Sequence, residues 1–202
     1  RLSLVGSEMC IRDRETMTEL IEYYKGIFTI LSSCASRQLE EVTFRRTVIP
    51  VQELLDAAGK YFKKLMKNRP ERIELEIEPM EAKVIGDVNQ LRFLLENLID
   101  EALTVREDGV IRLQARKDNE YIRFLFTDTR REKSVEELNQ LFYPNLARMT
   151  SGEKGELRGT EYLVCKQIIR DHDEFAGRRG CRINAEPAEG GGFTVYFTIP
   201  RR

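Results

Sequence analysis

The chain has 202 residues, of which 41% are hydrophobic and 33% charged, and its 33 Lys and Arg balance 34 Asp and Glu. This composition excludes a disordered chain, and without a basic surplus we expect no nucleic-acid partner. No apolar run reaches the roughly 20 residues that a membrane helix needs, so we expect no membrane contact in this fragment. The four cysteines form no CxxC pair and have one histidine to join them, which predicts reduced thiols in the cytoplasm and no metal site.

The first 46 residues divide into two predicted segments. Residues 1–14 contain SLVGSEMCIRDR, which resembles translated sequencing-adapter DNA at the ends of metagenomic sequences, so we expect them to be non-native. The alternative is a genuine helix start. Residues 15–46 are predicted to form a helical lead-in, because apolar residues recur there at steps of three and four. Such a stripe needs a partner helix, from a dimer or from an upstream segment.

Residues 47–202 are predicted to form one α+β domain, a two-layer sandwich of a mixed β-sheet with helices on one face. Its clearest element is a helix that begins at Asp87, a suitable N-cap, and carries an apolar face up to Leu103. The other predicted elements are strand Thr43–Pro50, a helix from Val51 to about Asn68, strands Ile73–Ile77 and Ala82–Ile85, a hairpin of Val110–Ala115 and Tyr121–Phe126, helices Val135–Phe142 and Gly159–His172, and strands Cys181–Glu186 and Phe193–Ile199.

Four segments, in this order, resemble the ATP-binding domain of two-component histidine kinases, a domain with the Bergerat fold of the GHKL superfamily. Asp87–Leu103 (DVNQLRFLLENLIDEAL) is similar to the N box, and Phe124–Thr129 (FLFTDT) to the G1 box. Gly159–Lys166 (GTEYLVCK) is similar to the G2 box, and Gly180–Pro200 to the family's last hairpin. The resemblance covers roughly Val48–Pro200 and implies a bacterial protein whose lead-in ends a dimerisation helix hairpin.

The resemblance also implies roles for single residues in a nucleotide site, with Mg-ATP as the cofactor. Asn97 takes the position of the asparagine whose carbonyl oxygen binds Mg²⁺ together with phosphate oxygens. Asp128 takes the position of the acid that accepts a hydrogen bond from the adenine amino group. No residue is assigned a catalytic role. The candidate nucleotide-binding residues are Asn97, Glu101, Asp128, Arg130, Gly159 and Thr160.

The same motifs lack residues that this nucleotide site uses. In the N box, Glu101 replaces the second asparagine and Thr104 the usual lysine, so an anion is added and a cation removed beside the phosphates. In the G1 box, Arg130 and Glu132 replace the glycines that allow close backbone approach. In the G2 box, Glu161 replaces a glycine where phosphates would lie. These changes argue against Mg-ATP binding.

The arginines that follow Asp128 leave two alternatives open. Arg130 and Arg131 could reach phosphates and compensate for the missing lysine, because guanidinium groups bind phosphate in a bidentate manner. Alternatively, Arg130, Glu161 or Tyr162 could fill the nucleotide cleft between the N-box and G2-box helices. We expect this cleft to be filled or narrowed.

A histidine kinase also needs a phosphoacceptor histidine, and the lead-in contains none. The chain's one histidine, His172, comes near the end of the G2-box helix. We expect it to be structural, favoured there by the helix dipole.

These observations favour a pseudokinase, not an enzyme, that acts as a regulatory interaction module in the cytoplasm, as the cytoplasmic portion of a longer membrane-anchored sensor. Its lead-in would form a homodimer or bind a partner kinase or response regulator. The alternative is a divergent, active histidine kinase that binds Mg-ATP through Asn97, Asp128 and Arg130 and phosphorylates an upstream histidine. A third hypothesis is an anti-sigma-factor-like module of the same superfamily that binds a transcription factor.

Overall fold

The computed structural model describes residues 44–143, 150–151, 157–158 and 161–202. Residues 44–143 and 161–202 belong to one compact unit, here called the main domain. Outside the main domain, β6 (Thr150–Ser151) and β7 (Leu157–Arg158) form a short antiparallel pair. The predicted segment 1–14 and almost all of the lead-in 15–46 lie outside the described residues, so both remain predictions.

The centre of the main domain is a mixed sheet with the strand order β2-β4-β5-β9-β8. β2 runs parallel to β4, and each of the other neighbouring pairs is antiparallel. A second, two-stranded antiparallel sheet joins β1 to β3, which lies beside β9. The strands of the two sheets are β1 (Thr47–Pro50), β2 (Ile73–Ile77), β3 (Lys83–Gly86), β4 (Gly109–Asp118), β5 (Tyr121–Asp128), β8 (Ile183–Pro187) and β9 (Phe193–Pro200).

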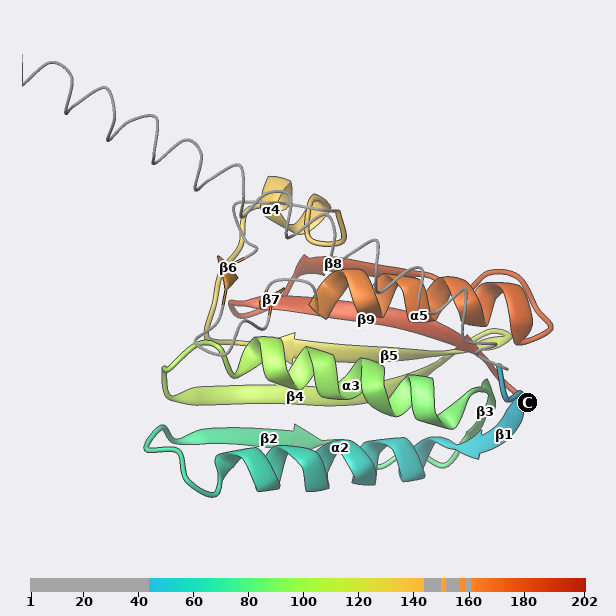
Figure 1. Ribbon diagram of the computed structural model, residues 1–202, viewed down its shortest axis with the longest axis horizontal. Coiled ribbons are helices and arrows are strands. Elements are labelled where there is room, and N and C mark those ends of the chain that lie inside the picture. Colours follow the sequence, from blue (N-terminus) through green and yellow to red (C-terminus); the bar gives the residue numbers. More distant parts are fainter. Residues whose placement is uncertain (1–43, 144–149, 152–156, 159–160) are drawn as a thin grey trace, which may run out of the picture. The chain divides into compact units, whose positions relative to one another are not determined.

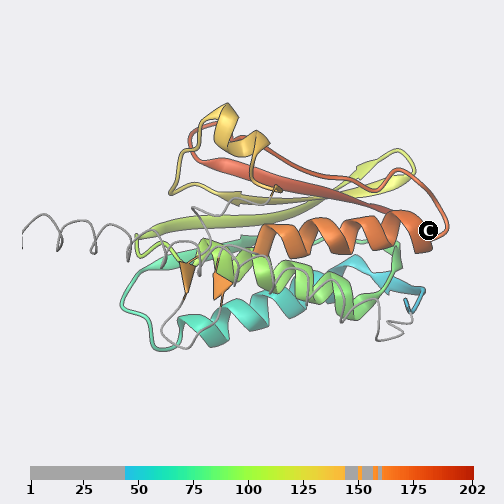
Figure 2. The ribbon, with the colours of Figure 1, turned by 45° about the horizontal axis from the view of Figure 1, so that its top comes forward.

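Three helices form a layer on one face of this sheet (Figures 1 and 2). They are α2 (Val51–Met66), α3 (Val88–Ala102) and α5 (Glu161–Phe175), and α3 packs against both of the others. A short helix, α4 (Val135–Asn139), lies next to β8 instead. The predicted α+β sandwich with a mixed sheet and helices on one face is therefore confirmed.

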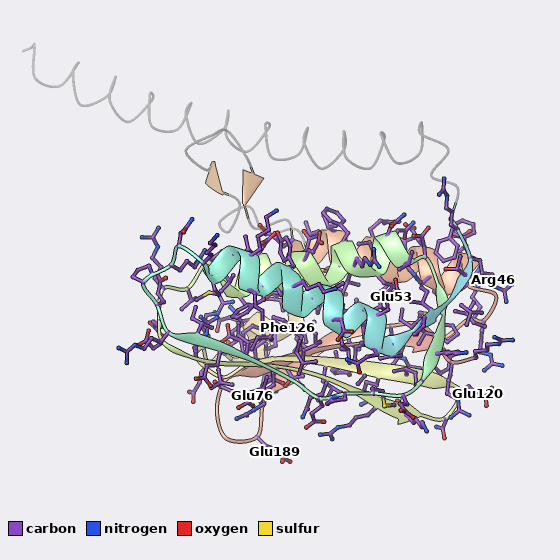
Figure 3. The ribbon with its side chains drawn as sticks, turned by 90° about the horizontal axis from the view of Figure 1, so that it is seen from below. Arg46, Glu53, Glu76, Glu120, Phe126 and Glu189 are labelled. Carbon is purple, nitrogen blue, oxygen red and sulfur yellow. The ribbon has the colours of Figure 1, made fainter. Side chains whose placement is uncertain are left out.

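The core lies between the helix layer and the sheet. In Figure 3, Phe126 lies between the helices and the strands, whereas Glu76 lies on the far side of the sheet. The burial pattern of β5 alternates, so Ile122, Phe124 and Phe126 face the core. Phe124 stacks on Phe197 of β9 with 4.8 Å between ring centroids. Because Asp128 continues the same alternation, its carboxylate also points inward.

The prediction for α3 is confirmed in detail. The Asp87 carboxylate accepts hydrogen bonds from the backbone N–H groups of Asn89 and Gln90, at 2.9 and 3.2 Å, and so caps the helix. The predicted apolar face is buried, since each of its side chains is at most 2% exposed: Leu91, Leu94, Leu95, Leu98, Ile99, Ala102 and Leu103.

Several element ends differ from the predictions. β4 continues to Asp118, because Asn119 adopts a positive φ of 52° and lets a two-residue turn join Asp118 to Tyr121. β5 begins at Tyr121 as predicted and continues past Phe126 to Asp128. α4 ends at Asn139 and not at Phe142, although Leu141 and Phe142 are buried beyond its end. α5 continues past His172 to Phe175. Hydrophobic patterns locate a buried segment but do not show where its helix ends.

Candidate functional site

The candidate site centres on Asp128, the last residue of β5. Its side chain is 1% exposed, which is costly for a carboxylate unless the charge is paired. Arg130 supplies that pairing: its Nε donates to Oδ1 at 2.8 Å and one terminal nitrogen, Nη2, donates to Oδ2 at 2.9 Å. The backbone N–H of Arg130 donates to Oδ1 as well, at 3.1 Å. Asp128 is therefore engaged at both oxygens from within the chain.

The rest of the Arg130 guanidinium is bonded to the region where α3 ends. Nη2 also donates to the carbonyl oxygen of Ala102 at 2.7 Å, and Nη1 lies 3.5 Å from the carbonyl oxygen of Val105 and 3.3 Å from that of Glu107. All five N–H donors of the side chain thus have acceptors, and the side chain is 2% exposed. The cation also lies at a helix C-terminus, where the helix dipole favours positive charge.

Gly109, at the start of β4, leaves the space that the Arg130 side chain occupies. Its φ is +148°, a conformation that favours glycine, and a Cβ at this position would lie 2.6 Å from Cγ of Arg130. Gly192 has a similar role against the backbone of Asp128, because a Cβ there would lie 2.1 Å from the Asp128 carbonyl oxygen. Two glycines therefore let the backbone of neighbouring strands fit around the Asp128–Arg130 pair.

Arg131 faces the end of α3 from the same turn. Its Nη1 lies 3.6 Å from Oε1 of Glu101, its Nε lies 3.5 Å from Oδ2 of Asp128, and its guanidinium lies 5.7 Å from the ring centroid of Phe193. The side chain is 18% exposed. Both guanidinium groups are therefore engaged by the domain itself, Arg130 by Asp128 and by backbone carbonyl groups, and Arg131 by Glu101 and Asp128. This arrangement argues against the alternative in which both arginines reach outward to phosphates.

Asn97 lies on α3 and is 9% exposed. Its Nδ2 donates to the carbonyl oxygen of Phe93 at 2.6 Å, one turn earlier in the same helix. Among the described residues, no hydrogen bond involves its Oδ1, the atom that the resemblance assigns to Mg²⁺. Thr104, which takes the place of the family's lysine, lies beyond the end of α3, and its hydroxyl donates to the carbonyl oxygen of Glu101 at 2.7 Å.

The described part of the G2 box is Glu161 and the α5 residues that follow it. Tyr162 is 7% exposed and its ring packs edge-on against Phe142. Burial, followed by the nearby Glu101 carboxylate, raises the pKa of Tyr162 well above its usual value, so the phenol stays neutral. Gly159 and Thr160 lie outside the described residues, and the filling of the cleft beside them stays a prediction.

His172 is a buried structural residue. It is 0% exposed, its Nδ1 lies 2.8 Å from the carbonyl oxygen of Ile168, and its Nε2 accepts the backbone N–H of Asp87 at 3.1 Å. Burial lowers the pKa of His172. The predicted structural role is therefore confirmed, but the helix dipole is not its cause, because the dipole favours a cation and this ring is held neutral.

Other functional groups are few within the described ranges. No cluster of three or more His, Cys, Asp or Glu residues that could hold a metal ion occurs there. Cys165 and Cys181 are free thiols, and burial raises the pKa of Cys181 to about 12. None of the described helices combines the length and the apolar composition that crossing a lipid bilayer takes.

The sequence of residues 86–202 matches the family of histidine kinase-, DNA gyrase B- and HSP90-like ATPases. The chain belongs to this family. The matched range begins at the residue before the α3 cap and ends with the chain, so it contains Asn97, Asp128 and Arg130. No curated protein matches the sequence.

Solved structures with a similar fold include several histidine kinases. A nucleotide-free catalytic domain of histidine kinase ThkA has a TM-score of 0.61 and 21% identity over 78% of this chain and 96% of that one. The mycobacterial sensor histidine kinase MprB has a TM-score of 0.61 and 18% identity over 78% of this chain and 99% of that one. ThkA in complex with the response regulator TrrA has a TM-score of 0.60 and 18% identity over 98% of this chain and 56% of that one. The fold is thus that of histidine kinase catalytic domains.

Proposed function

We propose that this protein is a pseudokinase: a histidine-kinase ATP-binding domain with a degenerate nucleotide site, acting as a regulatory interaction module in bacterial two-component signalling. The observation that carries the proposal is the buried ion pair of Asp128 and Arg130, in which Arg130 bonds both carboxylate oxygens. In the family the acid at the Asp128 position accepts a hydrogen bond from adenine. Here a residue of the chain takes that place.

The energies of the two arrangements favour the ion pair. An adenine amino group bonded to a carboxylate contributes about 1.5–3 kcal/mol, the range for hydrogen bonds to charged groups. Displacing Arg130 breaks a buried charge pair, which costs about 3–5 kcal/mol when one partner is lost. It also strips Arg130 of its bonds to the carbonyl groups near the end of α3. Adenine can therefore reach Asp128 only by displacing bonds that Arg130 already makes.

The other residues of the candidate site provide few contacts that would favour nucleotide binding. Asn97 is a single, neutral oxygen ligand, whereas Mg²⁺ requires six oxygen ligands and takes most of them from phosphates and water. Glu101 is anionic, and Glu161 adds another carboxylate at the start of α5, which opposes a triphosphate. The retained Asn97 is consistent with descent from a binding domain and does not by itself provide binding.

As a non-catalytic module, the protein would act through its partners. ThkA has been crystallised with a response regulator, which supports a partner of this class for a domain of the same fold. We propose that the lead-in 15–46 forms a homodimer or binds a partner kinase or response regulator, in the cytoplasm. Signalling would then depend on how the lead-in and the domain are connected.

The test is a thermal-shift titration of the full chain with Mg-ATP, with the Asn97→Ala variant as the control. We expect neither protein to be stabilised at millimolar nucleotide. A stabilisation of the wild-type protein that is absent from Asn97→Ala would overturn the proposal and favour the active-kinase alternative, because ligand binding to the folded state must raise its stability.

A further inference from the structure

The segment that connects the lead-in to the domain is held in place by buried groups. This junction segment consists of residues 44–46, the last three residues of the predicted lead-in, which are not helical and come directly before β1. The backbone N–H of Arg45 donates to Oδ2 of Asp87 at 2.8 Å. The ring of Phe44 packs edge-on against the ring of His172, with 4.9 Å between centroids. The segment is thus attached both to the cap of α3 and to the last turn of α5.

The third residue of the segment makes a further contact with the end of α5. Arg46 lies where β1 begins, at one end of the main domain (Figure 3). Its guanidinium lies against Gly177, just past α5, where an added Cβ would be 2.7 Å from Cζ of Arg46. Phe175 contacts the Phe44 ring at 5.8 Å between centroids. All three residues of the junction segment therefore depend on Asp87 or on the C-terminal end of α5.

The backbone of Asp87 is hydrogen-bonded to the imidazole of His172, and only one protonation state of the ring can form this bond. The carbonyl oxygen of Ile168 can only accept, so Nδ1 carries the proton of the neutral ring. Nε2 then has the lone pair that accepts the Asp87 N–H. A proton on Nε2 would place two N–H donors against each other. Gly86 closes the space on the β3 side, since a Cβ there would lie 2.8 Å from Nε2.

Burial lowers the pKa of His172, and carboxylates oppose this effect. The charged groups that face the ring are Asp87, at the start of α3, and Asp171, on α5 itself, and both favour the protonated form. β3 presents backbone at Gly86, and the junction segment presents the apolar ring of Phe44. The neutral ring therefore prevails at neutral pH, with two carboxylates nearby that can pair with the imidazolium once it forms.

We propose that Asp87 and His172 form an acid-sensitive latch for the junction segment, which is released when His172 gains a proton. A cationic His172 would lose the hydrogen bond from the Asp87 N–H and turn toward the carboxylate of Asp87 or Asp171. This movement would disturb the Asp87 cap that binds Arg45, and the ring contact between His172 and Phe44. The sheet would remain, because none of its strands depends on these bonds. Residues 44–46 would then be released from α3 and α5. This mechanism goes beyond the proposed function, since it does not depend on whether nucleotide binds.

The experiment is an NMR titration of the full chain from about pH 8 to about pH 5, the range in which a histidine titrates. Because His172 is the only histidine in the chain, one imidazole signal reports the latch. We expect the Nδ1-protonated tautomer at the upper end of this range, and a pKa of His172 below the usual histidine value of about 6.5. At the same midpoint, amide exchange of Arg45 should become roughly tenfold faster, after correction for intrinsic exchange, as for loss of one hydrogen bond. Amides of β5 should keep their protection.

The His172→Gln variant is the control, because its amide oxygen can accept the Asp87 N–H but does not titrate in this range. We expect its Arg45 amide to stay protected across the titration. Three results would overturn the latch: protection of Arg45 that is unchanged while the wild-type imidazole titrates, loss of β5 protection together with that of Arg45, or the same acid-induced release in His172→Gln. The thermal-shift titration with Mg-ATP is independent of all three.

Discussion

At the residue scale, the main feature of the candidate site is the buried Asp128–Arg130 pair. Both side chains are at most 2% exposed, and each satisfies the charge of the other. A buried pair of this kind contributes little net stability compared with an apolar pair, but removing one partner leaves an unpaired charge in the core. The pair is therefore stable as a unit and costly to open.

We predict that Arg130→Ala lowers the free energy of unfolding by about 3–5 kcal/mol, because Asp128 is left buried without its partner. Urea unfolding measures this loss. Arg112→Ala is the matched control: it removes an arginine whose ion pair with Glu76, at 2.7 Å, is about half exposed, and should cost about 0–1 kcal/mol. Equal losses of unfolding free energy in the two variants would show that burial does not make the Asp128–Arg130 pair costlier to break than an exposed pair.

The sequence located Arg130 in the G1 box but did not show which group its side chain binds. It showed that an arginine replaces a glycine of the G1 box, and the guanidinium chemistry suited phosphate and carboxylate equally well. The choice depends on Gly109, which lies 21 residues earlier and leaves space for the side chain. Contacts of that kind come from the pairing of β4 with β5, which hydrophobic patterns do not specify to the residue.

At the element scale, the start of α3 connects more parts of the domain than an ordinary helix cap. Asp87 accepts from Asn89 and Gln90 inside the helix and from Arg45 in the junction segment. Its backbone N–H donates to His172 of α5. One residue thus joins the junction segment and two helices, which explains why a carboxylate is found there with only 4% of its surface exposed.

We predict that Asp87→Ala lowers the free energy of unfolding by about 2 kcal/mol, at the upper end of the range for N-caps. The reason is that three backbone N–H groups lose their acceptor. Ser134→Ala, which removes the cap of the short helix α4 with its reciprocal Glu137 bond, is the comparison and should cost about 0.5–1 kcal/mol. Chemical denaturation of both variants measures the difference. A smaller loss for Asp87→Ala than for Ser134→Ala would contradict the connecting role of Asp87.

Secondary structure was predictable where apolar residues recur at a regular helical or strand spacing. The apolar face of α3 and the start of the β5 strand were identified correctly, because each element has one buried face. The ends of α4 and α5 were not, because Leu141 and Phe142 are buried outside a helix while Asp173 and Phe175 continue one. Apolar residues mark burial, and the hydrogen bonds that end a helix are set by neighbouring elements.

At the scale of the whole domain, one titratable group links stability to pH near neutrality. The pKa of His172 is lowered in the folded state by burial, so the unfolded chain binds its proton first as the pH falls. The contribution of the neutral ring is fully present above the unfolded value of about 6.5 and is lost as the pH falls below it.

We predict that the wild-type protein loses stability between about pH 7.5 and pH 5.5, and that His172→Gln loses less over the same interval. Urea midpoints across this interval give the slope for each protein. A wild-type slope equal to that of the variant would mean that His172 has the same pKa in the folded and unfolded states, and would contradict its assignment as a buried neutral ring.

The central claim is that Arg130 holds Asp128 and keeps nucleotide from the site. Its most direct test is calorimetric titration of Mg-ATP into the wild-type chain and into Arg130→Gly, which restores the glycine of the G1 box and frees the Asp128 carboxylate. We predict no saturable heat from the wild-type protein at millimolar nucleotide, and saturable binding to the variant. Saturable binding to the wild-type protein with an affinity that Arg130→Gly leaves unchanged would contradict the account.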